Sequence, residues 1–326
     1  MDNNLKKFIR NGYYDTPQFL QVEITDYCPL ACPQCYKKET NWSFIDFERF
    51  INIVNEAEKI GVKSITLNGG EPVLHPNFVE FVKECNKRKI ECAVITSGYG
   101  VDDKFCENIR KLKITIHISL NGSTEKINEY SRDGYDISIR AIKLLHKNNI
   151  PYIINWVARH DNVGDLENLI QLCKENGANS VNIVCNKIAA SDIAKSECNL
   201  DDYKKLKETI TKNSDYIKIQ NCYGVLMGYL GYIHGNNRLY GCQAAIRLMG
   251  VNVHGQYMPC THLYYFENAD SLMDYWRNSK MLNLIRKLGK LKFCGECNKC
   301  RVCHAITEET YQNMTLGYKN CPIKSE

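Results

Sequence analysis

Between residues 19 and 218, short β-branched runs alternate with longer amphipathic runs, and this alternation is the feature that most limits the possible folds. Six runs have the length and composition of strands, at residues 19–25, 62–68, 91–97, 113–120, 151–158 and 180–184. The segments between them carry apolar residues at helical spacing, and two of them end at Gly61 and Gly177. Six βα units in series predict a parallel sheet with helices outside, curled into a partial (β/α)6 barrel of the TIM type.

The sequence pattern changes after about Asn221, where the alternation stops and Gly, Tyr and Cys become frequent. A region with little regular core needs cross-linking, and bound metal is a natural means. We therefore expect an N-terminal segment at residues 1–18, an α/β barrel at 19–220, and a small, irregular, cysteine-rich domain at 221–326.

Seventeen cysteines among 326 residues are the unusual feature of the composition. No apolar run reaches the roughly 18 residues that span a bilayer, and the N-terminus has no secretory signal. The sequence therefore predicts a cytoplasmic protein without a membrane span, in which clustered cysteines are metal ligands rather than disulfides. The net charge of +5 is too mild and too evenly spread to indicate nucleic-acid binding.

The spacing Cys28-x3-Cys32-x2-Cys35 places three thiolates on one loop directly after the first predicted strand. A four-iron cluster normally takes four cysteines, so a triplet leaves one iron open to another ligand. A zinc site with a distant fourth ligand, or part of a ferredoxin-type cluster, is the alternative.

Polar and glycine-rich motifs follow the next predicted strands. Gly69-Gly70-Glu71-Pro72 follows the second, Ser97 ends the third, and Ser119 and Asn121 end the fourth. The carboxyl ends of barrel strands meet at one rim, where such folds carry their chemistry. We therefore expect these motifs and the cysteine triplet to converge on one site.

The triplet after the first strand, together with the glycine motif, resembles the signature of the radical S-adenosylmethionine (SAM) superfamily. The resemblance implies a [4Fe–4S] cluster on Cys28, Cys32 and Cys35, with SAM chelating the open iron. An electron from a flavodoxin- or ferredoxin-type donor would cleave SAM to a 5′-deoxyadenosyl radical, which abstracts a hydrogen from the substrate.

The same resemblance implies a set of SAM-binding residues. Glu71 would offer a carboxylate to the SAM ammonium, and Arg132 would pair with the SAM carboxylate in a segment where the usual Asp is replaced by Asn128. Gln34 stands where relatives carry an aromatic residue; its backbone would contact adenine, and Tyr36 would stack. The full set is Gln34, Tyr36, Gly69, Gly70, Glu71, Pro72, Ser97, Ser119, Asn121 and Arg132.

The C-terminal cysteines resemble the SPASM extension, which holds auxiliary [4Fe–4S] clusters. The resemblance implies one fully ligated cluster, and a second with an incomplete set because Thr307 stands at an expected cysteine. The first would use Cys294, Cys297, Cys303 and Cys321, and the second would use Cys242 and Cys260 with Cys300 or Cys222. A zinc-ribbon-like site is the alternative.

Many SPASM enzymes modify ribosomally made peptides or proteins by crosslinking, epimerisation or oxidation, so this is the function we expect. Thr261 replaces the catalytic Asp of sulfatase-maturating relatives, and His262 and His117 are further catalytic candidates. Because Cys28 lies so near the N-terminus, a separate protein would deliver a leader peptide, or the barrel would bind the substrate directly. Two alternatives are the same chemistry on a small metabolite, and a non-enzymatic iron–sulfur or zinc protein.

Overall fold

The computed structural model describes residues 12–37, 41–187, 196–232, 241–288, 303–305 and 321–323. The chain divides into two compact units. The first comprises residues 1–29, 37–117 and 244–290, and the second comprises 30–36, 118–243 and 291–326. The strand β4 (Ile114–Ser119) passes from the first into the second. The division at 18 and 220 that the sequence suggests stays a prediction.

The first unit is built on a sheet with the strand order β3-β2-β1-β8-β9. Its strands are β1 (Phe19–Thr25), β2 (Ser64–Gly69), β3 (Glu91–Thr96), β8 (Leu248–Val251) and β9 (Tyr257–Met258). All neighbours are parallel except β8 and β9, which are antiparallel. The last two strands were missed in the sequence because runs of four and two residues carry no readable alternation.

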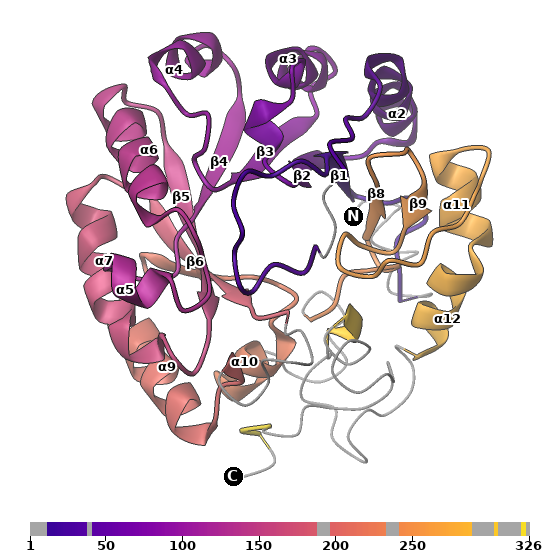
Figure 1. Ribbon diagram of the computed structural model, residues 1–326. Coiled ribbons are helices and arrows are strands. Elements are labelled where there is room, and N and C mark those ends of the chain that lie inside the picture. The colour runs from indigo at the N-terminus through magenta and orange to yellow at the C-terminus, as the bar shows by residue number, and fades with distance from the viewer. Residues whose placement is uncertain are drawn as a thin grey trace. The chain divides into compact units, whose positions relative to one another are not determined.

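Helices pack against one face of this sheet (Figure 1). Helix α2 (Phe47–Ile60) begins at Asp46, which accepts a hydrogen bond from the Arg49 N–H, and ends at Gly61 with a φ of 77°. It packs on α3 (Phe78–Lys87), where the rings of Phe50 and Phe81 stack with centroids 3.9 Å apart. The other helical segments of this unit are η1 (Pro72–Leu74), α4 (Asp103–Ile109), α11 (Leu272–Asn278) and α12 (Lys280–Leu288).

The two faces of β1 differ in chemistry. One face carries Leu20, Val22 and Ile24, all of them fully buried. The other face carries Gln21, Glu23 and Thr25, because successive side chains of a strand alternate. Glu23 is 2% exposed and Thr25 is fully buried, so this polar face is also shielded from solvent.

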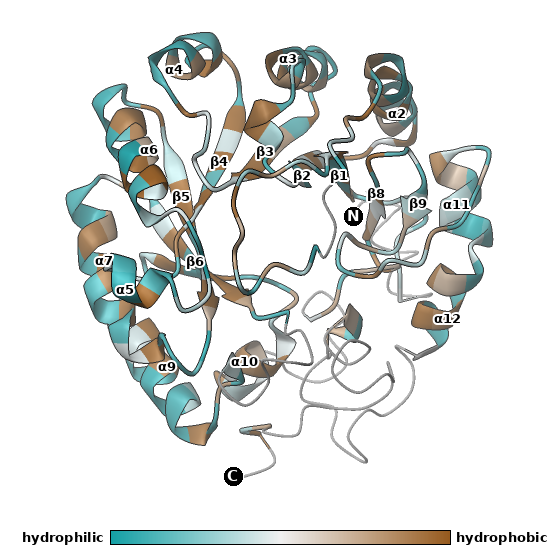
Figure 2. Cartoon of the chain, in the orientation of Figure 1, coloured by the Kyte–Doolittle hydropathy of each residue, from teal (hydrophilic) through white to brown (hydrophobic). Residues whose placement is uncertain are grey.

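The second unit repeats the βα arrangement. Parallel pairs join β5 (Tyr152–Ala158), β6 (Ser180–Cys185) and β7 (Ile217–Ile219). Figure 2 shows the helices beside these strands with hydrophilic residues directed away from them. These helical segments are α5 (Glu125–Asn128), α6 (Tyr135–Lys147), η2 (Val163–Asp165), α7 (Leu166–Glu175), α9 (Leu200–Lys212) and α10 (Gly224–Tyr229).

The expected parallel α/β architecture is confirmed, and each of the six predicted strands is found within two residues of its expected ends. The helix stops at Gly61 and Gly177 are also present, with φ values of 77° and 75°. Among the residues that the structure describes, no helix has both the length and the apolar character that crossing a membrane requires.

Replacing Asp46 by alanine removes the hydrogen-bond acceptor at the start of α2. We expect Asp46→Ala to lower the free energy of unfolding by about 1 kcal/mol, measured by urea denaturation. Asn52→Ala, at an exposed position of the same helix, should cause no loss. Equal effects of the two substitutions would contradict this role of Asp46.

Candidate functional site

The ends of β1 and β2 are joined at the glycine motif. The Gly70 N–H donates to the Thr25 carbonyl, and the Glu71 N–H donates to the Tyr27 carbonyl, each at 2.7 Å. A Cβ on Gly69 would lie 1.9 Å from the Thr25 oxygen, and one on Gly70 would lie 2.1 Å from the Tyr27 oxygen. Only glycine therefore allows this close approach of the two chains.

Glu71 connects the same turn to the end of β3. Its side chain is 1% exposed. It accepts hydrogen bonds from Thr96 Oγ1 at 2.5 Å, from the Ser97 N–H at 2.8 Å and from Ser97 Oγ at 2.5 Å. Burial raises the pKa of Glu71, and the bonds from Ser97 and Thr96 lower it. The carboxylate that was expected to meet the SAM ammonium thus accepts hydrogen bonds from the protein's own donors, and its contact with SAM stays a prediction.

The cysteine triplet is divided between the two units. Cys28 belongs to the first unit and is half-buried, whereas Cys32 (half-buried) and Cys35 (exposed) belong to the second. Within the second unit, the Cys35 N–H donates to the Cys32 carbonyl at 3.0 Å. All three sulfurs lie on the segment that directly follows β1, as the sequence predicts.

The second half of the cysteine loop is anchored to residues 131–133. The Gln34 N–H donates to the Ser131 carbonyl, and the Ala31 N–H donates to Asp133 Oδ2, both at 3.1 Å. The sequence offers no periodic signal for this anchor, because the contacts join residues about a hundred positions apart.

Two buried polar atoms beside this anchor, Gln34 Oε1 and Arg132 Nε, have no hydrogen-bond partner among the described residues. Unpaired buried polar atoms are costly, so a polar ligand is the natural partner for them. Gln34 was expected to contact adenine through its backbone. Its N–H donates to the Ser131 carbonyl and its side chain carries the unpaired acceptor, and the contact with adenine stays a prediction.

Asn121 is held by hydrogen bonds within the protein. Its side-chain Nδ2 donates to Ser131 Oγ at 2.8 Å, and its Oδ1 accepts from the Val157 N–H at 3.0 Å. Its own N–H donates to Asn128 Oδ1 at 2.9 Å. These bonds tie the fully buried Asn121 to the loop around Ser131, and its expected contact with SAM stays a prediction. Ser119 is 6% exposed at the end of β4.

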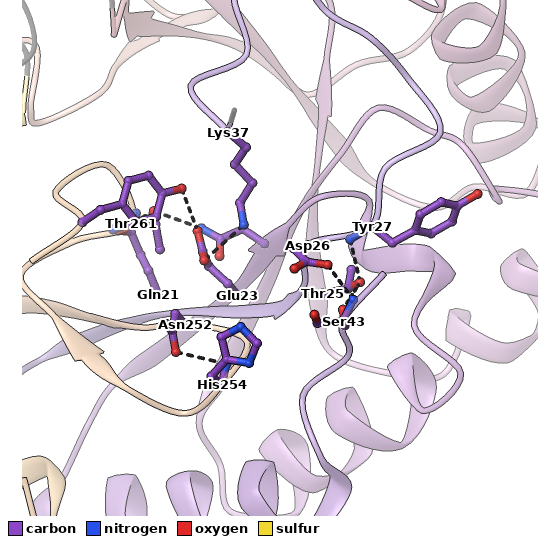
Figure 3. A network of polar contacts seen from close by, with 12 residues as sticks. Gln21, Glu23, Thr25, Asp26, Tyr27, Lys37, Ser43, Asn252, His254 and Thr261 are labelled. Carbon is purple, nitrogen blue, oxygen red and sulfur yellow. Dashed lines mark hydrogen bonds and ion pairs between the residues drawn. The ribbon is translucent and has the colours of Figure 1, made fainter. Parts of the chain in front are cut away.

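Thr261 is fully buried in the first unit (Figure 3). Its N–H and its hydroxyl lie 3.2 and 3.1 Å from Gln21 Oε1, and Asn68 Nδ2 donates to Thr261 Oγ1 at 3.3 Å. Thr261 is thus tied to β1 and β2. The other two catalytic candidates, His262 and His117, are half-buried, as is Tyr36; the roles expected of them stay predictions.

Figure 3 also shows an ion pair that was missed in the sequence. Lys37 Nζ lies 3.1 Å from Glu23 Oε2, and the two side chains are 8% and 2% exposed. Tyr264 donates to Glu23 Oε1 at 3.4 Å. Burial raises the pKa of Glu23, and the neighbouring ammonium lowers it. The one available signal was a glutamate inside a strand whose neighbours on both sides are apolar.

The remaining cysteines are only partly described. Cys242, Cys303 and Cys321 are buried, and Cys222 and Cys260 are half-buried. Cys294, Cys297 and Cys300, like Thr307, lie outside the described residues. Across the described ranges, no group of three or more Cys, His, Asp or Glu side chains has the arrangement of a metal site. The auxiliary-cluster ligands therefore stay a prediction.

Lys187 joins two of these cysteines within the second unit. Its Nζ lies 3.2 Å from Cys222 Sγ and 3.3 Å from Cys303 Sγ. Burial raises the pKa of the Cys222 thiol, and the Lys187 ammonium lowers it. The sequence pattern assigned Cys303 to one auxiliary cluster and made Cys222 a candidate for the other, whereas the structure brings the two sulfurs to one ammonium.

Comparison with known proteins agrees with this geometry. Residues 22–173 match the model of the Radical SAM superfamily. A PqqA peptide cyclase of Gluconobacter oxydans is 24% identical over 286 residues, which cover 83% of this chain and 79% of that protein. The radical SAM match implies SAM and a [4Fe–4S] cluster as cofactors.

Solved structures of Streptococcus suis SuiB share the fold. SuiB bound to S-adenosylmethionine has a TM-score of 0.80 at 20% identity, covering 98% of this chain and 80% of SuiB. SuiB bound to the precursor peptide SuiA has a TM-score of 0.79 at 19% identity, with coverage of 98% and 79%.

We expect Glu71→Gln to lower the free energy of unfolding by about 1–3 kcal/mol, because an amide N–H₂ would face the donors of Thr96 and Ser97. SAM affinity of the iron-reconstituted protein should fall with it, as measured by calorimetry. Glu80→Gln, at an exposed position paired with Lys83, should leave both unchanged. An unchanged stability of Glu71→Gln would show that the buried carboxyl is protonated in the folded state.

Proposed function

We propose that this chain is a radical SAM enzyme that modifies a ribosomally made peptide. The observation that carries the proposal is the cysteine triplet directly after β1, whose preceding residues Thr25 and Tyr27 bind the Gly69–Glu71 turn. The match of residues 22–173 to the radical SAM family supports the same conclusion.

In this proposal, Cys28, Cys32 and Cys35 hold the [4Fe–4S] cluster and leave one iron for SAM. When bound, the cluster and SAM supply a 5′-deoxyadenosyl radical that abstracts a hydrogen from the substrate. SAM fits the two unpaired atoms, Gln34 Oε1 and Arg132 Nε. The adenine amino group of SAM can donate to Gln34 Oε1, and the SAM carboxylate can accept from the Arg132 Nε–H.

The chain's own residues shape the site. Glu71 accepts hydrogen bonds from Thr96 and Ser97 and so holds the Gly69–Glu71 main chain against the end of β3. The carbonyl groups of this main chain would then accept hydrogen bonds from the SAM ammonium. Ser131 and Asp133 hold the Ala31–Gln34 part of the cysteine loop. Each of these two anchored segments would help to orient SAM.

A peptide substrate is supported by the proteins that this chain resembles. The Gluconobacter oxydans relative is a PqqA peptide cyclase, and SuiB has been solved with its precursor peptide SuiA. We propose a precursor peptide as the substrate and a flavodoxin- or ferredoxin-type protein as the electron donor. We further propose that Cys242, Cys260, Cys303 and Cys321 help to hold one or two auxiliary clusters.

Replacing Cys28 by alanine should abolish 5′-deoxyadenosine formation from SAM under dithionite, because the cluster loses one of three ligands. We expect about four fewer iron atoms per chain after anaerobic reconstitution. Cys106→Ala, at a buried position outside the triplet, should keep both iron and SAM cleavage. SAM cleavage that survives Cys28→Ala would reject the assignment of the cluster.

The substrate class is tested with short precursor peptides encoded beside this gene. The reconstituted enzyme, SAM and a reductant should convert such a peptide to a product that differs from it in mass or, after epimerisation, in chromatographic retention, as measured by liquid chromatography with mass spectrometry. If SAM is cleaved but every such peptide is recovered unchanged, the peptide assignment fails while the radical SAM assignment stands.

A further inference from the structure

Five buried or half-buried polar residues of the first unit form one continuous surface, which we call the polar wall: Gln21, Glu23, Lys37, Asn68 and Thr261. Glu23 on β1 lies directly opposite Asn68 on β2 in the parallel register, so the two side chains are neighbours on one face. Gln21 is two residues earlier on the same face. Thr261 contacts Gln21 and Asn68. Lys37 contacts Glu23 (Figure 3).

Stability does not account for this surface. A buried ion pair such as Lys37–Glu23 loses the hydration of both charges, and an apolar pair of similar volume is commonly as stable or more so. The opposite face of β1, with Leu20, Val22 and Ile24, demonstrates that this strand packs well with apolar residues. A buried polar surface on the other face therefore points to a ligand.

Asn68 carries the second observation. Its side chain is 6% exposed, and its Oδ1 has no hydrogen-bond partner among the described residues. Its Nδ2 already donates to Thr261. The unpaired oxygen can accept an N–H or O–H, and leaving it unpaired costs free energy. The polar wall thus has one vacant acceptor.

Lys37 supplies donors to the same surface. The Lys37 ammonium has three N–H groups, and one of them pairs with the Glu23 carboxylate. Tyr264, which also contacts Glu23, is 41% exposed, so the edge of the polar wall reaches solvent.

The charge of the polar wall selects among ligands. Lys37 and Glu23 neutralise each other, so a carboxylate would gain from the ammonium but meet the Glu23 charge. A ligand ammonium would be attracted by the Glu23 carboxylate but repelled by the Lys37 ammonium. A neutral amide has an N–H for Asn68 Oδ1 and a carbonyl for Lys37, and it adds no net charge.

We propose that the polar wall binds an amide group of the substrate, with Asn68 Oδ1 accepting its N–H and Lys37 donating to its carbonyl. This inference rests on the proposed function and names the group of a peptide that the enzyme holds. The amide comes from the peptide main chain or from an Asn or Gln side chain, and Lys37 and Asn68 are positioning residues that do not themselves react.

The test uses the full chain, reconstituted with iron and sulfide and saturated with SAM. Saturation-transfer NMR compares N-acetylalanine N-methylamide with its free acid, N-acetylalanine, and its free amine, alanine N-methylamide. Acetamide represents the side-chain source. We expect N-acetylalanine N-methylamide, the blocked alanine, to bind more tightly than either charged form. Its affinity relative to that of acetamide distinguishes a main-chain amide from a side-chain amide.

Two variants assign the binding to the polar wall. Asn68→Leu removes the vacant acceptor at nearly constant volume, and Lys37→Met removes the ammonium. Each substitution should lower the affinity for N-acetylalanine N-methylamide about tenfold. Lys83→Met, which breaks the exposed pair with Glu80, is the matched control and should bind as the parent does.

Lys37→Met leaves Glu23 buried without its partner and so risks unfolding. The double variant Lys37→Met/Glu23→Gln keeps a neutral pair, and thermal denaturation followed by circular dichroism reports whether it folds. If the folded double variant binds the probe as the parent does, the pair is merely structural and the proposal is overturned.

Two further results would overturn it. They are equal or tighter binding of either charged probe, and failure of the parent protein to bind any amide probe. A parent protein that cleaves SAM but binds no amide contradicts the polar wall alone. A parent protein that forms no 5′-deoxyadenosine contradicts the proposed function itself.

Discussion

The close approach of Gly69 and Gly70 to the main chain of β1 is the constraint on which the candidate site depends. It aligns the carboxyl ends of β1 and β2, and it does so through two 2.7 Å hydrogen bonds to Thr25 and Tyr27, the last residues before the cysteine triplet. Glu71 then extends the junction to β3. The start of the cysteine loop is thus fixed by backbone contacts that no side chain larger than hydrogen would permit.

The parts of this structure that are readable in the sequence are those with local signals. Strand periodicity located six strands, and Gly61 and Gly177 marked the ends of two helices. The glycine motif was recognisable because its residues are adjacent. The contacts that were missed join distant residues: Lys37 with Glu23, Gln34 with Ser131, and Lys187 with Cys303. Their residue types alone do not distinguish them from exposed polar positions, because only tertiary packing decides which polar groups are buried.

β1 shows how one strand serves both stability and function. Its alternation directs Leu20, Val22 and Ile24 into the apolar core, which supplies the favourable free energy of burial. The residues between them, such as Glu23, are then free to carry polar chemistry on the other face. Because the period of a strand is two, a shift of one residue would exchange the faces, so the register with β2 that sets Glu23 opposite Asn68 is also what preserves the core.

For Asn121 and the C-terminal cysteines, the sequence motif alone does not identify the partners of the side chain. Asn121 occupies a position expected to contact SAM, yet three hydrogen bonds within the protein use its amide and its N–H. The resemblance assigned Cys303 to one cluster and made Cys222 a candidate for the other, and both sulfurs lie within 3.3 Å of Lys187 Nζ. Spacing limits which sulfurs can share a site, but the partners of a buried group are set by what lies around it in space.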